Sequence, residues 1–219
     1  MKCVKKDFYN TNQAVPVLNG ISQIFQKGFS YAIVGSSGCG KSTLLHVIAG
    51  IDASSSGEIS YDSHAINAMN CVQKSALLHD TLGLVFQDSY LINELSVLEN
   101  IILKGLIAGK NYATCYKRAY ALLQAMGLLD KAHVLPIHLS GGQQQRIALA
   151  RALFSQPDFL IADEPTGSLD EKASHEIINL ILSLQRSYNM GIVISTHNQS
   201  IAARMDYQLH LQDGLLTSS

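Results

Sequence analysis

The sequence lacks any run of about 18 uninterrupted apolar residues, the length that a membrane-spanning helix requires. Its most apolar stretch, VLENIILKGLIAG, is interrupted by Glu99 and Lys104. The opening residues, MKCVKKDFYN, carry charges but have no apolar stretch behind them, so no signal peptide is expected. We therefore expect a cytoplasmic protein. If it acts at a membrane, a separate chain must anchor it there.

Closely spaced cysteines and an excess of one charge are also lacking. Cys3, Cys39, Cys71 and Cys115 are far apart and form neither a C-x-x-C pair nor a Cys/His metal-binding spacing. This pattern indicates free thiols in a reducing compartment. Sixteen Lys and Arg against 17 Asp and Glu leave a formal charge of −1. Without a basic excess, no nucleic-acid partner is expected.

Proline is scarce, with four residues, and no linker-like segment or internal repeat divides the chain. At 219 residues, 47% of them hydrophobic, the chain can bury a sizeable core as one domain. Strand-like apolar runs alternate with helical patterns, which predicts an α/β fold with a mostly parallel sheet. The first thirty residues alternate in polarity and contain Asn19-Gly20, a hairpin dipeptide. We expect short antiparallel strands there, forming an N-terminal β subdomain.

Residues 88–156 interrupt the strand–helix alternation with helical patterns. Ser96 and Ser140 each begin a capping box that opens a helix, and a further helix ends at Gly127. The sequence thus predicts a single domain over 1–219, with a core of 1–87 and 157–219 and an inserted α-helical lobe of about 88–156. The other expected elements are strands at 31–34, 58–62, 82–86, 159–162 and 191–195, helices at 41–50 and 170–188, and a hairpin turning at Asp213-Gly214.

A glycine-rich loop, GSSGCGKST, lies between the buried strand 31–34 and a helix and satisfies G-x-x-x-x-G-K-[ST]. Its glycines allow backbone N–H groups to surround a phosphate, and the helix N-terminus adds its dipole. Lys41 can reach β- and γ-phosphate oxygens, and the Ser42 hydroxyl can bind Mg²⁺. Cys39 is expected to contribute only its backbone. The expected cradle comprises Gly35, Ser36, Ser37, Gly38, Cys39, Gly40, Lys41, Ser42 and Thr43.

Two adjacent carboxylates follow the apolar strand in FLIADEP. The end of this strand is where open α/β sheets bind ligands. Successive side chains of a strand point in opposite directions, so Asp163 and Glu164 cannot do the same job. Asp163 suits the hydration shell of Mg²⁺, whereas Glu164 would act on an attacking water as general base or orienting group. An acidic pair after a strand is often only a helix-capping turn, but the phosphate loop favours the catalytic interpretation.

Three further motifs follow in a fixed order: Gln87 in VFQD, LSGGQ at 139–143, and His197 in ISTH. With them the chain resembles the ATP-binding-cassette (ABC) ATPases over essentially its whole length. The resemblance implies a P-loop NTPase core of RecA-like type, ATP and Mg²⁺ as cofactors, and hydrolysis of ATP. GSLD, which ends at Asp170, resembles the loop that follows the acidic strand in this family.

In this family two cassettes pair head to tail, and the signature LSGGQ of one covers the nucleotide on the phosphate loop of the other. A Ser hydroxyl, two glycine amides and a helix N-terminus make an anion site without a lysine. The resemblance implies that Ser140, Gly141, Gly142 and Gln143 contact the nucleotide. It implies that Gln87 contacts Mg²⁺ and the water, and that His197 forms a hydrogen bond with the γ-phosphate. Asp170 would lie at the dimer interface, and the adenine would stack on Phe8 or Tyr9.

Within the family, ADEPTGSLD and ARMDYQLHLQDGLL resemble cassettes of lipoprotein release, macrolide efflux, bacteriocin export and FtsE-like cell division. This implies the ATPase subunit of a membrane transport or mechanotransmission complex, peripheral on the cytoplasmic face of the plasma membrane. Its partners would be a second copy or another cassette and a separate integral membrane subunit. The alternative is a soluble ABC ATPase of DNA repair or translation. Asn198, where relatives commonly have Asp, departs from the family pattern.

Overall fold

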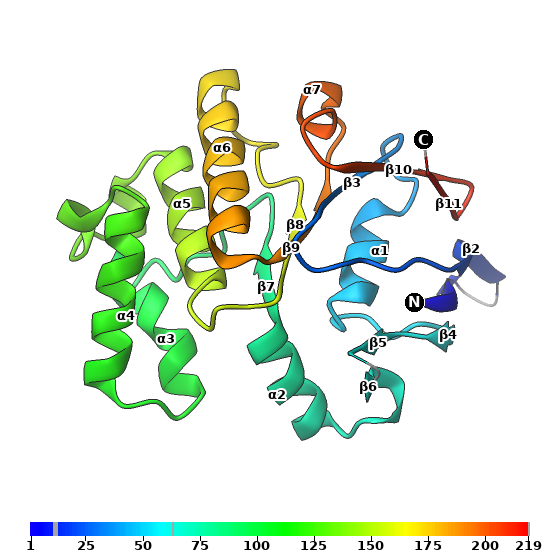
Figure 1. Cartoon of the computed structure of the whole chain (residues 1–219), viewed down its shortest axis with the longest axis horizontal. Coiled ribbons are helices and arrows are strands. Elements are labelled where there is room, and N and C mark those ends of the chain that lie inside the picture. The colour runs from blue at the N-terminus through cyan, green and yellow to red at the C-terminus, as the bar shows by residue number, and fades with distance from the viewer. Residues whose placement is uncertain (11–12, 63, 219) are drawn as a thin grey trace.

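The computed structural model describes residues 1–10, 13–62 and 64–218. Its centre is a six-stranded sheet in the order β11-β10-β3-β9-β8-β7 (Figure 1). All neighbouring strands run parallel except β10 and β11. The predicted α/β fold with a mostly parallel sheet is confirmed. The strands are β3 (Ser30–Val34), β7 (Leu82–Val85), β8 (Phe159–Asp163), β9 (Gly191–Ser195), β10 (Tyr207–Gln212) and β11 (Leu215–Ser218).

The central strands are apolar on both faces because helices or strands cover both. β3 and β9 are buried at every position. Ile33, Ile161 and Val193 point into one core, which they share with α1 (Lys41–Ile48). Ala32 and Ala162 point into a second core on the opposite face, shared with α3, α4, α5 and α6.

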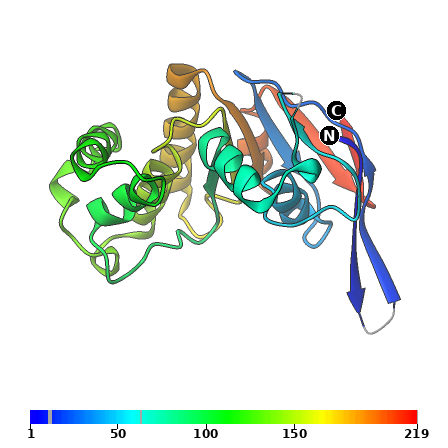
Figure 2. The same cartoon turned by 90° about the horizontal axis from the view of Figure 1, so that it is seen from below.

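The helices of this second core gather on one side of the sheet (Figures 1 and 2). They are α3 (Val97–Ile107), α4 (Tyr112–Ala125), α5 (Gly141–Ala152) and α6 (Glu171–Tyr188). The capping boxes predicted at Ser96 and Ser140 are both present. α3 to α5 fall within residues 88–156, but the exact division into core and lobe stays a prediction. The shorter helical elements are α7 (Gln199–Ala202) and three 3₁₀ helices at 66–68, 129–131 and 136–138.

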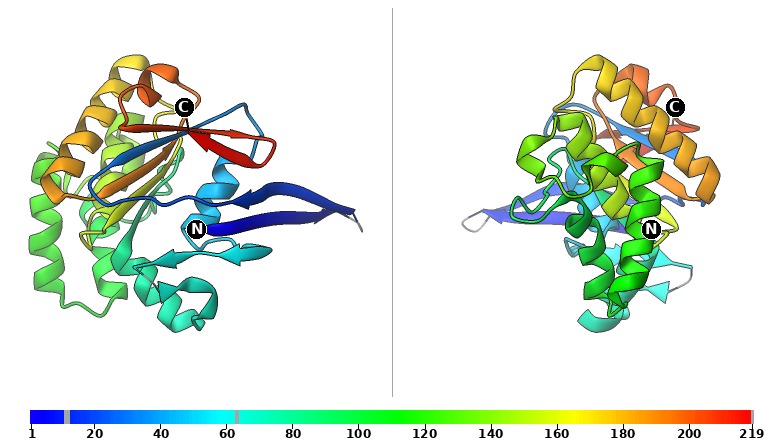
Figure 3. Two further views of the ribbon diagram at one scale, coloured as in Figure 1. Left: turned by 45° about the vertical axis from the view of Figure 1, so that its right-hand side comes forward. Right: turned by 90° about the vertical axis from the view of Figure 1, so that its left-hand side faces the viewer.

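The N-terminal strands form the expected antiparallel subdomain. β1 (Lys2–Asn10) lies between β2 (Gln13–Ile21) and β4 (Ser56–Glu58), and the β1–β2 ribbon extends away from the body (Figure 3). A two-stranded ladder, β5 (Ser60–Tyr61) and β6 (His64–Ala65), follows.

The hairpin turn predicted at Asn19-Gly20 is wrong. Lys5 pairs with Asn19 and Val4 with Ile21, so Gly20 is an extra residue within β2, a β-bulge with φ +90°. Asn19 instead contacts the distant hairpin at Asp213-Gly214, donating its backbone N–H to the Gly214 carbonyl at 2.8 Å. That second turn does connect β10 to β11, as predicted.

Two α-helices were not predicted, the four-residue α7 and the longer α2 (Cys71–Thr81). α2 has no buried residue and little amphipathic pattern, so hydrophobic periodicity gives no signal. It begins at a capping box of Asn70 and Gln73, a motif that the sequence does contain. Leu78 of α2 packs on Gly50. A Cβ added to Gly50 would lie 2.7 Å from Leu78 Cδ1. Over the described ranges, no helix is both long enough and apolar enough to cross a membrane.

Candidate functional site

The glycine loop joins β3 to α1 at the carboxyl edge of the sheet. Gly38 and Gly40 have φ of +79° and +102°, the left-handed region that glycine tolerates best. A Cβ on Gly40 would lie 2.8 Å from Val17 Cγ1, and one on Gly35 would lie 2.5 Å from the Leu211 carbonyl oxygen. The loop is therefore held tightly between β2 and β10, and side chains at these positions would force it apart.

Lys41 folds back over this loop. Its side chain is 7% exposed, and its ammonium donates to the carbonyls of Gly35 and Ser36, both at 3.0 Å. The neighbouring Ser42 is exposed, and no acidic residue lies in the first turn of α1. A cation, free backbone N–H groups and a helix N-terminus at one point fit the phosphates of a nucleotide.

Asp163 is the last residue of β8, and Glu164 follows it. β9 lies between β8 and β3, the strand that leads into the phosphate loop. Asp163 Oδ1 accepts a hydrogen bond from the Ser195 hydroxyl at 2.5 Å. Glu164 has φ +43°, which is unusual for a residue with a side chain. Its N–H donates to Ser195 Oγ at 2.9 Å and to the Ser195 carbonyl at 3.2 Å. Ser195 therefore bonds the carboxylate of Asp163 and the backbone of Glu164, and the different roles of the two carboxylates stay a prediction.

His197 meets Glu164 directly. Its Nδ1 lies 2.7 Å from Glu164 Oε2, so that a proton on Nδ1 is donated to the carboxylate. The His197 side chain is 66% exposed and that of Glu164 23%. A cleft of about 330 Å³ opens beside the pair, with Gly167 and His175 also lining it. The structure therefore brings together two residues that the sequence separates by more than thirty positions.

Gln87 follows β7 and lies against the loop after the acidic pair. A Cβ on Gly167 would come 3.0 Å from Gln87 Cδ. Ser42, Asp163 and Gln87 offer hydroxyl, carboxylate and amide oxygens, the hard ligands that Mg²⁺ prefers. The described residues contain no group of three or more His, Cys, Asp or Glu that could hold a metal. This sparse donor set fits an ion that keeps waters and phosphate oxygens among its ligands.

The signature serine caps α5. The Gln143 N–H donates to Ser140 Oγ at 3.3 Å, and the Ser140 N–H donates to Gln143 Oε1 at 3.0 Å. A Cβ on Gly141 would come 3.3 Å from Leu169 Cδ2. α5 belongs to the core on the face opposite α1. Ser140 is therefore not part of the wall formed by the chain's own phosphate loop.

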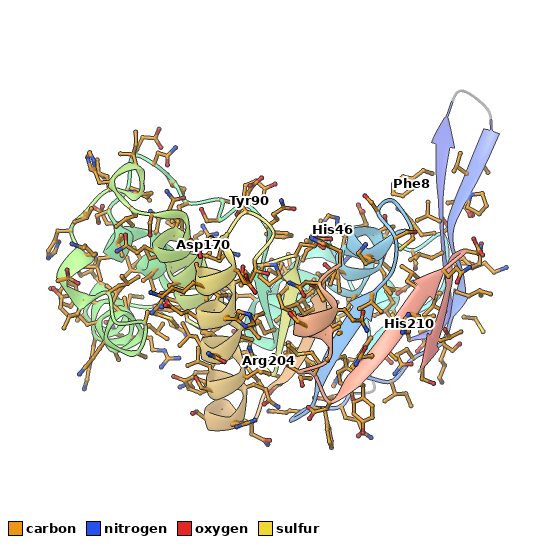
Figure 4. All side chains as sticks on the ribbon, turned by 90° about the horizontal axis from the view of Figure 1, so that it is seen from above. Phe8, His46, Tyr90, Asp170, Arg204 and His210 are labelled. Carbon is orange, nitrogen blue, oxygen red and sulfur yellow. The ribbon has the colours of Figure 1, made fainter. Side chains whose placement is uncertain are left out.

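Asp170 and Phe8 lie at separate places in the molecule (Figure 4). Asp170 caps α6, accepting the Ala173 N–H at 2.8 Å. Phe8 lies on β1 with 44% of its surface exposed, and the Lys6 ammonium lies 4.8 Å from its ring centroid. The side chain of Tyr9 is outside the described part of the chain, so the choice between Phe8 and Tyr9 stays open.

The sequence patterns do not single out Ser195, although it bonds both the Asp163 carboxylate and the backbone N–H of Glu164. The signal was available in principle, because β8 and β9 pair in register with Asp163 opposite Ser195. It required knowing that these two strands are neighbours.

Comparison with known proteins decides the family. Residues 18–167 match the family model described as ABC transporter. The chain belongs to this family. Two of its curated relatives are lipoprotein-releasing system ATP-binding proteins named LolD. The LolD of Treponema pallidum is 39% identical over 97% of this chain and 94% of the relative. The LolD of Hydrogenovibrio crunogenus is 38% identical over 96% of this chain and 92% of the relative. YbbA of Escherichia coli K12, an uncharacterized ABC transporter ATP-binding protein, is 40% identical over 97% and 93%.

Solved structures agree with this assignment. The ATP-binding cassette MJ0796, in a dimeric post-hydrolysis state bound to ADP and Pi, superimposes with a TM-score of 0.91 at 31% identity, covering 100% of this chain and 96% of that one. A second dimeric structure of MJ0796 gives 0.90 at 32% identity, covering 98% and 94%. The ABC fold and the ATP hydrolase class predicted from the sequence are confirmed, as is the likeness to the lipoprotein-release group.

Proposed function

We propose that this ABC ATPase is the ATP-hydrolysing subunit of a membrane transport or mechanotransmission complex of the lipoprotein-release type, working with Mg²⁺ as a head-to-tail dimer. One observation carries the dimer: α1, which begins in the phosphate loop, and α5, which begins in the signature, pack on opposite faces of the sheet. In our proposal, the signature that completes each nucleotide site therefore comes from a second cassette. Macrolide-efflux and bacteriocin-export complexes are other members of the same functional class.

The residues divide the work by their chemistry. Lys41 and the backbone N–H groups of Gly35–Thr43 bind the phosphates, and Phe8 or Tyr9 stacks on the adenine. Ser42, Asp163 and Gln87 hold magnesium, which when bound supplies positive charge to the β- and γ-phosphate oxygens. These interactions orient the γ-phosphate for in-line attack.

Glu164 and His197 act on the water and the γ-phosphate. The left-handed backbone at Glu164 directs its carboxylate to His197 Nδ1, which leaves a lone pair of the carboxylate to orient a water or accept its proton. His197 Nε2 is then free to bond the γ-phosphate. Ser140, Gly141, Gly142 and Gln143 of the partner close the site, and Asp170 lies at the interface between the cassettes.

A groove suits the expected membrane partner. A cavity of about 490 Å³ lies between α2, β7 and α3, lined by apolar side chains that include Leu78, Leu84, Phe86, Leu103 and Ile107. Phe86, which precedes Gln87, and Asn100, at the end of the segment after Gln87, both line it. The family resemblance implies that this segment receives a helix of the transmembrane subunit. Because Phe86 is next to Gln87 in the chain, a helix seated in this recess would have a route to influence hydrolysis.

Complementation between two inactive variants tests the proposal. In a head-to-tail dimer, Glu164→Gln inactivates the site on its own phosphate loop, whereas Ser140→Ala inactivates the site on the partner. A mixed dimer contains one site with neither change. We therefore expect each variant to be inactive alone and the equimolar mixture, combined before ATP is added, to recover about a quarter of wild-type ATPase activity.

The matched control is a mixture of Glu164→Gln with His197→Ala, because both changes affect the chain that holds the nucleotide. Each mixed dimer then has no intact site, and no recovery is expected. Recovery in the control mixture, or none with Ser140→Ala, contradicts the reciprocal dimer. Wild-type turnover in Glu164→Gln alone contradicts the role of Glu164.

A further inference from the structure

A buried hydroxyl connects the two successive acidic residues of the site. Ser195 ends β9, has 0% of its surface exposed, and lies opposite Asp163 in the β8–β9 pairing. Its Oγ donates to Asp163 Oδ1 at 2.5 Å and accepts the Glu164 N–H at 2.9 Å. A hydroxyl has one donor and two acceptor sites, so a single group serves both neighbours. The four residues before Ser195, Gly191–Ile194, are apolar and buried.

The donor side of this hydroxyl fixes the Asp163 carboxylate. Rotation about the terminal bond of an aspartate is only weakly restricted by its own rotamer preferences. The bond from Ser195 selects one rotation and occupies Oδ1. Oδ2 takes no part in this bond and remains for the magnesium and waters that the proposed function assigns to Asp163.

The acceptor side fixes the backbone of Glu164. Residues with a side chain rarely adopt φ near +43° unless their surroundings hold them there. The Glu164 N–H is held by two acceptors of one residue, the hydroxyl and the carbonyl of Ser195. From this backbone the carboxylate reaches His197 at 2.7 Å. Loss of the hydroxyl leaves the longer bond of 3.2 Å to hold the bend.

We propose that Ser195 is a positioning residue for ATP hydrolysis, because its one hydroxyl both orients Asp163 and holds Glu164 toward His197. The inference rests on the proposed roles of Asp163 and Glu164 and adds the group that couples them. Any change in this hydroxyl alters magnesium binding and water activation together, although it touches neither.

Two substitutions separate positioning from packing. Ser195→Ala removes the hydroxyl, and Ser195→Thr retains it on a β-branched side chain that strands accommodate. We expect Ser195→Ala to lower kcat about ten- to a hundredfold, since small misplacements of catalytic groups cost this much. KM for MgATP should rise by no more than about tenfold, the loss expected from weaker magnesium binding. Ser195→Thr should keep kcat within about threefold of wild type.

A second measurement does not depend on hydrolysis. Equilibrium binding of a fluorescent ATP analogue is compared with magnesium and with a chelator present. In Ser195→Ala the affinity for the nucleotide without magnesium should match wild type, because the phosphate loop is unchanged. The increase in nucleotide affinity that magnesium produces should be about tenfold smaller, which is the typical effect of removing a group that hydrogen-bonds to a metal ligand. Wild-type kcat together with a wild-type magnesium effect in Ser195→Ala overturns the inference.

If both variants lose activity, a crystal structure of nucleotide-free Ser195→Ala decides. An unmoved Asp163 carboxylate with Glu164 still at positive φ and in contact with His197 overturns the inference, and displaced carboxylates support it. Glu164→Gln assayed in parallel separates the two proposals. If Glu164→Gln is inactive while Ser195→Ala is fully active, only the role of Ser195 fails. If Glu164→Gln is active, the proposed catalytic role of Glu164 fails.

Discussion

Asn100 offers the sharpest test of how the segment after the Gln87 motif is held. The residue is 1% exposed, and its side-chain amide lies within hydrogen-bonding distance of four backbone atoms. Its oxygen accepts the Ile92 N–H at 2.8 Å, and its NH₂ group lies 3.0 Å from each of the carbonyl oxygens of Ile92, Leu95 and Ser96, which share its two N–H donors. One amide group therefore clamps the chain entering α3.

Asn100→Ala does not orphan all four partners. The Ile92 carbonyl still accepts the Leu95 N–H, and the Ser96 carbonyl still accepts the backbone N–H of residue 100. The Ile92 N–H and the Leu95 carbonyl lose the partners described here. At about 1–3 kcal/mol for each group left unsatisfied, and with Ile92 40% exposed so that water relieves part of the loss, we expect about 2–4 kcal/mol of destabilisation.

For a chain of this size, such a loss corresponds to a fall in melting temperature of about 5–15 °C. Thermal unfolding followed by circular dichroism measures it, with Asn93→Ala, an exposed residue of the same segment, as the control that should stay within about 2 °C. If Asn100→Ala has the same melting temperature as the wild type, the conclusion that this amide holds the segment before α3 in place is refuted.

Two more predictions concern charge and close packing. Desolvation by burial lowers the pKa of Lys104 to about 8, below its value of about 10.4 in an unfolded chain. Between these pH values the unfolded state binds one more proton than the folded state, so the free energy of unfolding should rise with pH. Urea titrations from pH 7.5 to 9.5 should show this rise in the wild type relative to Lys104→Met, and the same pH dependence in both proteins would argue against it. Gly167→Ala should displace the Gln87 side chain, because the added Cβ would lie 3.0 Å from Gln87 Cδ. We expect ATPase activity to fall several-fold while the melting temperature is unchanged. Full activity would show that the Gln87 contact is not needed.

Much of the architecture could be predicted because local and long-range signals agreed. The buried strands β3, β8 and β9 appeared as continuous apolar runs, and Ser96 and Ser140 marked helix starts that the structure retains. The failures have physical causes. Asn19-Gly20 has the composition of a turn, but β1 continues alongside it and Gly20 becomes a bulge.

The candidate site divides in the same way. Loop motifs such as Gly35–Thr43 could be read directly, because a phosphate cradle is built from consecutive residues. The contact between Glu164 and His197 and the link through Ser195 depend on the order of strands in the sheet. α2 escaped prediction because it buries no residue, so neither its existence nor its contact with Gly50 leaves a hydrophobic pattern.

The backbone at Glu164 has a consequence for engineering. A glycine would adopt φ +43° with less strain, and the left-handed conformation costs a residue with a side chain about 1–2 kcal/mol. A search for thermostable variants would therefore favour replacement at this position, and the winners would be expected to lose turnover. In this enzyme, a substitution at Glu164 that raises thermal stability is therefore expected to lower turnover.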